Sequence, residues 1–277
     1  MPVKIDLTRY SSKLKGESRK IISNLFPFEK NNYICVLEHS SITRMLGKNK
    51  KETELSSSLP DIWRMLTNVE RDQLRHNARI VHFKKNELIY LEEESSKELM
   101  CLFKGKVKIF KSGVGGRSQI IRIIRPVQYF GYRAYFAREP YVTAASAFEA
   151  CTVCMIPMEL IEQFLRNNGD LALFFIQMLS IDLGIADQRV VNLTQKHVRG
   201  RLAESLIFLK ESYGLEEDGA TINIYLARED LANLSNMTTS NAIRTLSNFV
   251  NEHIITIDGR KIKIIDEERL RKISRIG

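Results

Sequence analysis

The segment from Asp170 to Leu193 constrains the fold of this chain more than any other, because it contains no proline and follows the pattern of one long helix. Two apolar stripes run along it. The first has heptad spacing and comprises Ile176, Leu179, Leu183, Ala186, Val190 and Leu193. The second comprises Leu171, Phe174, Met178, Ile181 and Ile185. At about 100° per residue the stripes lie on different sides, so the helix must bury two faces.

Two buried faces need two partners. We expect the second stripe to cover the domain that precedes the helix. The heptad stripe is expected to pack against the same helix of a second copy, which gives a homodimer. A helix wholly buried within one large domain is the alternative, but the segments before it offer only one surface to cover.

Those preceding segments are short β-type runs between residues 78 and 156. They read ARIVHF, ELIYL, ELMCLF, KVKIF, SQIIRIIR, YVTAASAF and ACTVCMI, and a short amphipathic helix, DIWRMLTNVERDQL, comes before them. Many short strands with short turns predict a small antiparallel barrel or roll. The glycine-rich turn Gly113–Gly116 joins two of these strands, and no helix follows it, so we interpret it as a hairpin turn rather than a phosphate loop.

A second unit follows a predicted hinge at TQKHVRG. It contains a helix, RLAESLIFLKESYG, a short strand, TINIYL, and two further helices, AREDLANLS and TTSNAIRTLSNFVNEH. Asn236 occupies the turn between the last two helices, where asparagine tolerates a left-handed backbone. The closing segment HIITIDGRKIKIID predicts a hairpin around Asp258-Gly259. Together these elements predict a winged helix-turn-helix.

The last of these helices carries the candidate nucleic-acid contacts. Thr238 is a good N-cap, and Ala242, Leu246 and Phe249 form a buried face. Short hydroxyls and Arg244 are left pointing outward, and arginine pairs with guanine in the major groove of DNA. The predicted DNA-binding residues are Thr238, Thr239, Ser240, Asn241, Arg244 and Ser247.

Composition adds limits rather than a function. A chain of 277 residues with 44% hydrophobic content can form two domains. No apolar run reaches the length of a membrane span and residues 1–30 lack the pattern of a secretory signal, so we expect a cytoplasmic protein without a membrane partner. The net charge of +9 suggests an anionic partner. Its positive excess is largest in residues 1–55 and smallest after residue 195, so charge alone does not locate a nucleic-acid site.

Residues from about 60 to 266 resemble the Crp/Fnr family of bacterial transcription regulators. The resemblance rests on KGKVKIF, FGYRAYF, HVRGRLAESLIFL and LAREDLANLSNMTTSNAIRTL. It implies an α+β fold in four parts. These are an N-terminal extension over 1–55, whose structure the sequence leaves open, a cyclic-nucleotide-type antiparallel β-roll over 56–168, a dimerisation helix over 169–195 and a winged helix-turn-helix over 196–277. The implied partners are double-stranded DNA with an inverted repeat, a second copy of the chain and RNA polymerase.

The resemblance also identifies the residues of an effector pocket. They are Gly131, Tyr132, Arg133, Val142, Thr143, Ala186 and Asp187. Relatives that bind a cyclic nucleotide carry a glutamate at the position of Tyr132 and an arginine at that of Val142. A buried cyclic phosphate would lose its charged partner here, so cyclic AMP is not the expected effector. Two alternatives stay open. Another small anion binds to Tyr132, Arg133 and Thr143, or the pocket is vestigial.

The cysteines argue against most metal cofactors. An iron–sulfur cluster of the oxygen-sensing branch needs closely spaced cysteines near the N-terminus, where this chain has only Cys35. Cys35 and His39 lack the second pair that zinc requires. Cys151 and Cys154 are expected to point to opposite faces of one strand. Haem or another small effector stays open, with no residue that singles itself out.

The sequence therefore predicts a homodimeric DNA-binding regulator whose roll senses an effector other than cyclic AMP. One rival is a ligand-independent, low-specificity structural DNA-binding protein. A second rival is an enzyme fused to a regulatory β-roll. Residues 196–277 contain no Ser/His/Asp, paired-carboxylate or phosphate-loop constellation, so no enzyme is expected.

Overall fold

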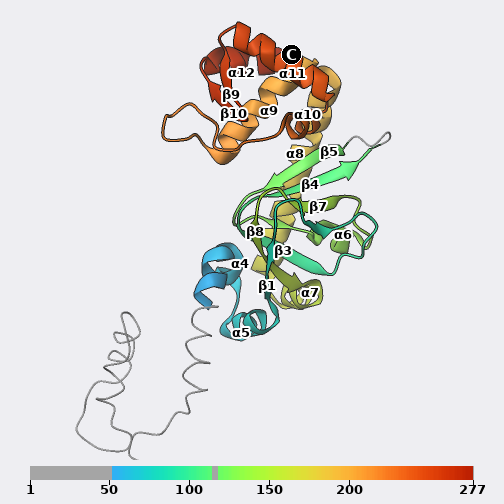
Figure 1. Ribbon diagram of the computed structural model, residues 1–277. Coiled ribbons are helices and arrows are strands. Elements are labelled where there is room, and N and C mark those ends of the chain that lie inside the picture. Colours follow the sequence, from blue (N-terminus) through green and yellow to red (C-terminus); the bar gives the residue numbers. More distant parts are fainter. Residues whose placement is uncertain (1–51, 114–117, 277) are drawn as a thin grey trace, which may run out of the picture. The chain divides into compact units, whose positions relative to one another are not determined.

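The structure, a computed structural model, describes residues 52–113 and 118–276 (Figure 1). The N-terminal extension up to residue 51, with Cys35 and His39, lies outside the described residues, as does most of the glycine-rich turn at Gly113–Gly116.

The first part is an antiparallel β-roll, as predicted. Its strands are β1 (Arg79–Phe83), β2 (Leu88–Tyr90), β3 (Glu98–Lys104), β4 (Val107–Ser112), β5 (Ser118–Ile124), β6 (Tyr129–Phe130), β7 (Ala144–Ala147) and β8 (Cys151–Pro157). They form two four-stranded sheets, in the orders β1-β8-β3-β6 and β2-β7-β4-β5. All pairings between them are antiparallel.

Strand β3 shows how the roll is packed. Met100 and Leu102 join the apolar cluster between the two sheets, whereas Leu99 and Cys101 join a second cluster with the helices. This alternation follows from the two-residue period of a strand, and both faces of β3 are buried. Cys151 and Cys154 of β8 divide in the same way, which confirms that their side chains point to opposite faces.

The helix predicted over DIWRMLTNVERDQL is two helices. They are α4 (Pro60–Met65) and α5 (Asn68–Asn77). Thr67 between them has an extended backbone, and it forms a capping box with Glu70 in which each side chain bonds the other residue's backbone N–H. The threonine therefore starts a new helix, because its hydroxyl satisfies an N–H that a continuous helix would pair with a carbonyl.

Two shorter helices precede the long one. They are α6 (Tyr132–Ala137) and α7 (Met158–Asn167), and the long helix is α8 (Gly169–Gln195). Leu171 and Phe175, near the start of α8, are buried. Phe174 and Met178 of the second stripe also pack against the core beneath the helix, as predicted. The prediction is wrong for the rest of this stripe, since Ile181 and Ile185 are 56% and 48% exposed. Apolar packing against the roll ends after the first turns of α8, and the next contact with the roll is an ion pair.

Most of the heptad stripe of α8 is uncovered in the part of the chain that the structure describes, where Leu179 is the member that packs against the core. Ile176, Leu183 and Val190 are 57%, 63% and 61% exposed. Among the described residues, α8 is also the one helix long and apolar enough to cross a membrane by length and composition. It carries the charged residues Asp182 and Arg189, and Asp182 is paired with the roll.

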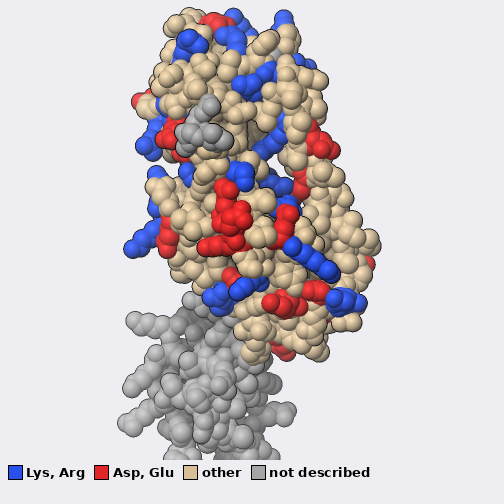
Figure 2. All heavy atoms as spheres, turned by 90° about the vertical axis from the view of Figure 1, so that its right-hand side faces the viewer, with Lys and Arg blue, Asp and Glu red and all other residues tan. Residues whose placement is uncertain are grey.

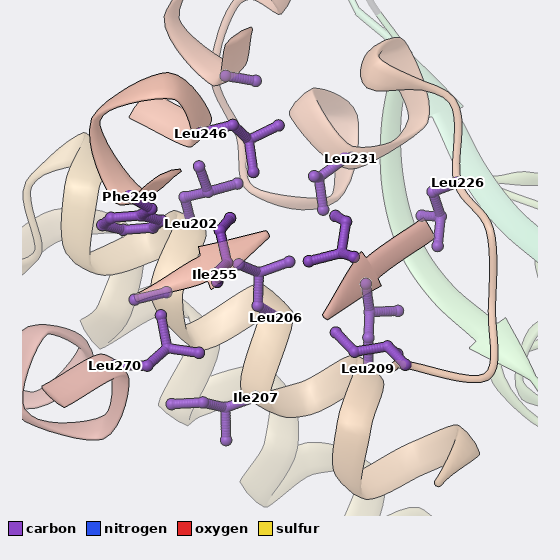
Figure 3. Close-up of a cluster of buried hydrophobic side chains, with 14 of the residues drawn as sticks. Leu202, Leu206, Ile207, Leu209, Leu226, Leu231, Leu246, Phe249, Ile255 and Leu270 are labelled. Atoms are coloured by element: carbon purple, nitrogen blue, oxygen red, sulfur yellow. The ribbon is translucent and has the colours of Figure 1, made fainter. Parts of the chain in front are cut away.

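The C-terminal part is a winged helix-turn-helix followed by one more helix. Its elements are α9 (Val198–Tyr213), α10 (Arg228–Leu234), α11 (Thr239–Asn251), β9 (Ile255–Asp258), β10 (Lys261–Ile264) and α12 (Glu267–Ile276). Figure 3 shows Leu202 and Leu206 of α9 beside Ile255 of the wing, with Leu246 and Phe249 of α11 in the same cluster. Helix α12 was not predicted from the sequence.

Two local expectations in this part need correction. TINIYL forms isolated bridges at Thr221 and Ile222 rather than a strand. In the wing, Asp258 pairs with Lys261, so the turn residues are Gly259 and Arg260 rather than Asp258 and Gly259. Gly259 has a φ of 55°, a left-handed value that costs glycine little.

Candidate nucleic-acid interface and sensor pocket

The turn between α10 and α11 is tight, and hydrogen bonds from α9 hold it in place. Asn236 adopts the predicted left-handed backbone, with a φ of 49°. Arg201 of α9 donates through Nε to the carbonyl of Ser235 at 3.2 Å and through Nη2 to the carbonyl of Asn236 at 3.1 Å. This role of Arg201 was not predicted from the sequence. These bonds fix the turn to α9, so the angle between α10 and α11 depends on a third helix.

Helix α11 begins as its sequence predicts. The hydroxyl of Thr238 accepts a hydrogen bond from the backbone N–H of Asn241 at 3.2 Å, which caps the first turn. Ala242, Leu246 and Phe249 are buried. The opposite face is exposed and presents Thr239, Ser240, Ile243, Arg244 and Ser247.

Two side chains on this face already have partners within the helix. Arg244 donates through Nη2 to Oδ1 of Asn241 at 2.8 Å, one turn back. Ser247 donates its hydroxyl hydrogen to the carbonyl oxygen of Ile243 at 3.1 Å. Asn241 therefore holds the guanidinium of Arg244 in one orientation, and Ser247 must break a bond before it can donate elsewhere.

The wing adds further cations beside this helix unit. Arg228, the first residue of α10, donates to the carbonyl of Gly259 at the wing turn at 2.8 Å. Lys261 and Lys263 pair with Glu216 and Asp218. Arg260 is exposed and has no ion pair among the residues described, so its charge is available to a phosphate.

Charge does not single out the interface on the face of the molecule that Figure 2 presents. Figure 2 shows Lys and Arg side chains interspersed with Asp and Glu on the face that it presents. The geometry of α11 and the wing, rather than a basic surface, identifies the candidate interface.

At the predicted effector pocket, a polar cluster links three elements of the structure, and we call it the Asp182 cluster. It consists of Arg122 of β5, Tyr132 of α6 and Asp182 of α8. Arg122 donates through Nη1 and Nη2 to the two carboxylate oxygens of Asp182, each at 2.8 Å. The Tyr132 hydroxyl donates to Oδ2 at 2.9 Å. Burial, and secondarily the carboxylate of Asp182, raise the pKa of Tyr132, so the phenol stays protonated as the donor.

Glycine at position 131 has a structural cause. Its φ is 87°, and a Cβ there would lie 2.7 Å from Cε of Met100 and 3.0 Å from the carbonyl oxygen of Glu98. The left-handed backbone and the lack of space both exclude other residues. Nearby, the rings of Tyr90 and Tyr141 stack with centroids 3.9 Å apart, and burial raises the pKa of Tyr90 to about 12.

The other predicted pocket residues lie apart from the Asp182 cluster or at its edge. Arg133 is exposed and pairs with Glu139 at 2.6 Å. Val142 is 42% exposed. Ala186 and Asp187 lie about one turn beyond Asp182 on α8 and are exposed. Thus α8 meets Tyr132 through Asp182, which the sequence analysis did not single out because its partner Arg122 lies sixty positions earlier.

The side chains offer no evident metal site in the part of the chain that the structure describes. No group of three His, Cys, Asp or Glu side chains is placed to hold an ion there. Cys101, Cys151 and Cys154 are all buried in the roll.

Comparison with known proteins matches both halves of this arrangement. Residues 80–168 match the cyclic nucleotide-binding domain family, and residues 200–273 match the Crp-like helix-turn-helix domain family. Over 196 residues, 70% of this chain and 88% of the other, the protein is 24% identical to the CRP-like cAMP-activated global transcriptional regulator of Mycobacterium tuberculosis. It is 29% identical over 176 residues to the anaerobic regulatory protein of Bacillus subtilis, covering 63% and 74% of the two chains.

The fold has counterparts among solved structures. FixK2 from Bradyrhizobium japonicum matches with a TM-score of 0.64 at 22% identity, covering 71% of this chain and 96% of that chain. The β-roll, the long helix and the helix-turn-helix follow one another here in the order that the sequence predicted, and the two matched families fall on the first and the last of them. The chain belongs to the Crp/Fnr family of DNA-binding transcription regulators.

Proposed function

We propose that the protein is a sequence-specific regulator that acts as a homodimer, paired through α8, and binds an inverted repeat in double-stranded DNA. The observation that carries this proposal is the outward face of α11, which presents Thr239, Ser240 and Arg244 to solvent on a capped helix of a helix-turn-helix. Such a face fits the major groove, where arginine pairs with guanine O6 and N7. Thr238, Asn241 and Ser247 complete the proposed contact set, and Arg260 of the wing adds a phosphate contact.

Pairing through α8 is supported by its uncovered heptad stripe. Exposed residues such as Leu183 and Val190 repeat at the spacing of a coiled-coil seam. A second copy would bury this stripe and give the assembly a two-fold axis, and two-fold symmetry matches an inverted repeat. The charged side chains Asp182 and Arg189 favour this assignment over a membrane span. We accordingly assign the protein to the cytoplasm, with RNA polymerase as a further partner.

The roll is proposed to sense an effector other than cyclic AMP. Position 142 carries valine instead of a cation, so a buried cyclic phosphate would lack its charged partner. The carboxylate of Asp182 accepts a hydrogen bond from Tyr132, another predicted pocket residue, so a negative charge already lies there. An effector would act by changing how α8 packs on the roll, and the break at Lys196–His197 between α8 and α9 would carry the change to the helix-turn-helix.

One observation favours a second candidate, a DNA-binding protein that needs no ligand and has low specificity. The three side chains of the Asp182 cluster satisfy one another, so the pocket does not need an effector to pair its charges. This candidate shares α8 pairing and the α11 interface with the main proposal, and differs from it in sequence preference and effector response.

Selection from randomised duplexes tests the proposal, followed by titration of the winning sequence at several salt concentrations. We expect an inverted repeat whose half-site centres lie about 34 Å apart, one turn of DNA. Its affinity should exceed that for unrelated duplex by at least about 10³-fold. Enrichment of no sequence, with binding that depends only on salt, would contradict sequence-specific regulation and favour the second candidate.

A further inference from the structure

Two cysteines face each other within the β-roll. Strands β3 and β8 pair in a register that sets Cys101 directly opposite Cys154. Both residues are 0% exposed, and both belong to the apolar cluster that joins the roll to the helices. Cys151 of the same strand lies in the other cluster, between the two sheets. The register therefore brings two thiols together on one face of the sheet and leaves the third on the opposite face.

The backbone hydrogen bonds show which type of pair this is. Leu102 donates its N–H to the carbonyl of Gln128 and accepts from the N–H of Val127, so its polar groups point away from β8. Polar groups alternate in direction along a strand, so those of Cys101 point toward β8. Opposite residues of such a hydrogen-bonded pair have Cα atoms about 5.5 Å apart, which is within the range that a disulfide spans.

A disulfide at this pair would be strained. The Cβ atoms of a hydrogen-bonded pair lie toward the upper end of the range of about 4.5–5.5 Å, whereas a disulfide holds them about 3.8 Å apart. The two strands must therefore approach each other locally before the bond can form. Strain of this kind makes a disulfide easier to reduce, so a bridge here suits reversible oxidation rather than a permanent cross-link.

The segment just before α4 covers this pair. The Cys101 thiol donates to the carbonyl oxygen of Ser58 at 3.3 Å, and Leu55 and Leu59 of the same segment are fully buried in the cluster that contains both thiols. Buried cysteines are ordinarily inert, so an oxidant would reach the pair only when this segment moves aside. A disulfide sulfur has no hydrogen to donate, so oxidation would also remove the bond to Ser58.

We propose that Cys101 and Cys154 form a redox-sensitive pair, which hydrogen peroxide oxidises to an intrachain disulfide. One thiol attacks a peroxide oxygen; the O–O bond breaks, a sulfenic acid forms and one water leaves. The other thiol then attacks that sulfur; the S–S bond forms, the S–O bond breaks and a second water leaves. The two thiols lose two electrons to the peroxide, and a dithiol reductant reverses the change. This inference goes beyond the proposed DNA-binding function and does not depend on it.

The test uses the full-length protein without DNA. The chain has four cysteines; trypsin releases Cys101 in the peptide 98–104 and both Cys151 and Cys154 in the peptide 139–166. Oxidation is therefore mapped in the wild type and in Cys151→Ala, which leaves Cys154 as the one cysteine of its peptide. After treatment with hydrogen peroxide, the remaining thiols are alkylated in denaturant and the peptides are identified by mass spectrometry.

We expect the wild type to lose two of its four thiols. In the wild type and in Cys151→Ala, the peptides 98–104 and 139–166 should be joined, and dithiothreitol added to the native protein should restore the thiols. The matched control is Cys154→Ala, which keeps Cys151 in the same peptide and should form no bridge. The two mapped proteins decide the result, so a folding defect in Cys154→Ala would not obscure it.

Four intact thiols, at a peroxide concentration that oxidises the urea-unfolded protein, would overturn this inference. A bridge that uses Cys35 or Cys151, or a sulfinic acid at Cys101 or Cys154 without a bridge, would overturn it as well. Because no DNA is involved, any of these results would leave the regulator proposal standing. Failure of the DNA selection would in turn leave the redox pair untouched.

Discussion

The hydroxyls of Thr239 and Ser240 on α11 and the polar groups of the Asp182 cluster differ in whether they already have partners. On α11, the hydroxyls of Thr239 and Ser240 have no hydrogen bond to another described residue. In the Asp182 cluster, Arg122 of β5 and Tyr132 of α6 both donate hydrogen bonds to Asp182 of α8. A DNA duplex can therefore be contacted through these hydroxyls without loss of existing bonds, whereas an effector that uses the Asp182 cluster must first displace an internal partner.

The largest predicted effect is the loss of the dimer, on which DNA binding by two copies of α11 depends. Leu183→Lys places a charge on the heptad stripe of α8, which the proposed dimer buries. A monomer would contact one half-site instead of two, and the loss of linked binding should weaken DNA affinity by about a hundredfold or more. Analytical ultracentrifugation should show a monomer.

The control is Gln188→Lys, which adds the same charge at an exposed position of α8 outside the heptad stripe. It should leave the dimer intact. A Leu183→Lys protein that remains dimeric would place the interface elsewhere.

Arg244→Ala should have the next largest effect, and it tests the outward face of α11. A bidentate arginine–guanine contact contributes about 1–3 kcal/mol of discrimination, so each half-site should lose about that much and the preference should relax at one base pair. Selection with the variant, followed by titration, measures both. Arg275→Ala on α12 removes an equal charge from an exposed position and should change neither.

A phosphate contact would give a different result. If Arg244→Ala weakens binding to all sequences alike and lowers the salt slope by about one unit, Arg244 neutralises a phosphate and does not read a base.

The contrast between the two sites also explains what the sequence could predict. The features of α11 are local: Thr238 caps Asn241 three residues on, and the buried and exposed faces follow from helical periodicity. The strands of the roll other than the two-residue β6 were likewise predictable from local β-type runs, and so was the separation of Cys151 from Cys154. Interactions over a few residues leave a pattern in the sequence.

Long-range pairing leaves no such pattern. Arg122 and Asp182 are sixty positions apart, and Arg201 reaches the turn at Ser235 from another helix. The predicted cover for Ile181 and Ile185 failed for the same reason, because apolar spacing does not reveal where the surface of the roll ends.

A third, smaller effect tests whether the hydrogen bond between Tyr132 and Asp182 stabilises the protein. Tyr132→Phe removes only the hydroxyl that donates to Asp182, and loss of this part-buried bond should lower the free energy of unfolding by about 1 kcal/mol. Urea denaturation measures the change. Tyr135→Phe is the matched control, because Tyr135 also donates to a carboxylate, that of Glu162, at a more exposed site. Its cost should be under about 0.5 kcal/mol, and an equal cost for both variants would mean that the Asp182 bond has no special weight.

For cyclic AMP we expect no effect on the protein. Cyclic AMP at millimolar concentration should leave the melting temperature and the affinity for the selected duplex unchanged, because a ligand stabilises a protein only by binding its native state. The Mycobacterium tuberculosis relative, described as cAMP-activated, serves as the positive control. A saturable rise in melting temperature for this protein would show that the pocket accepts the nucleotide despite Val142.

The buried thiol of Cys101 can report how often the segment that covers it opens. Its side chain is fully buried, and its thiol donates to the carbonyl of Ser58 at 3.3 Å, in the helical segment just before α4. Burial raises the pKa of this thiol, so almost no thiolate forms while the cover is closed. The rate at which a thiol reagent labels Cys101 would therefore measure how often that segment opens. An effector that stabilises the closed roll would lower this labelling rate without any change in the average fold.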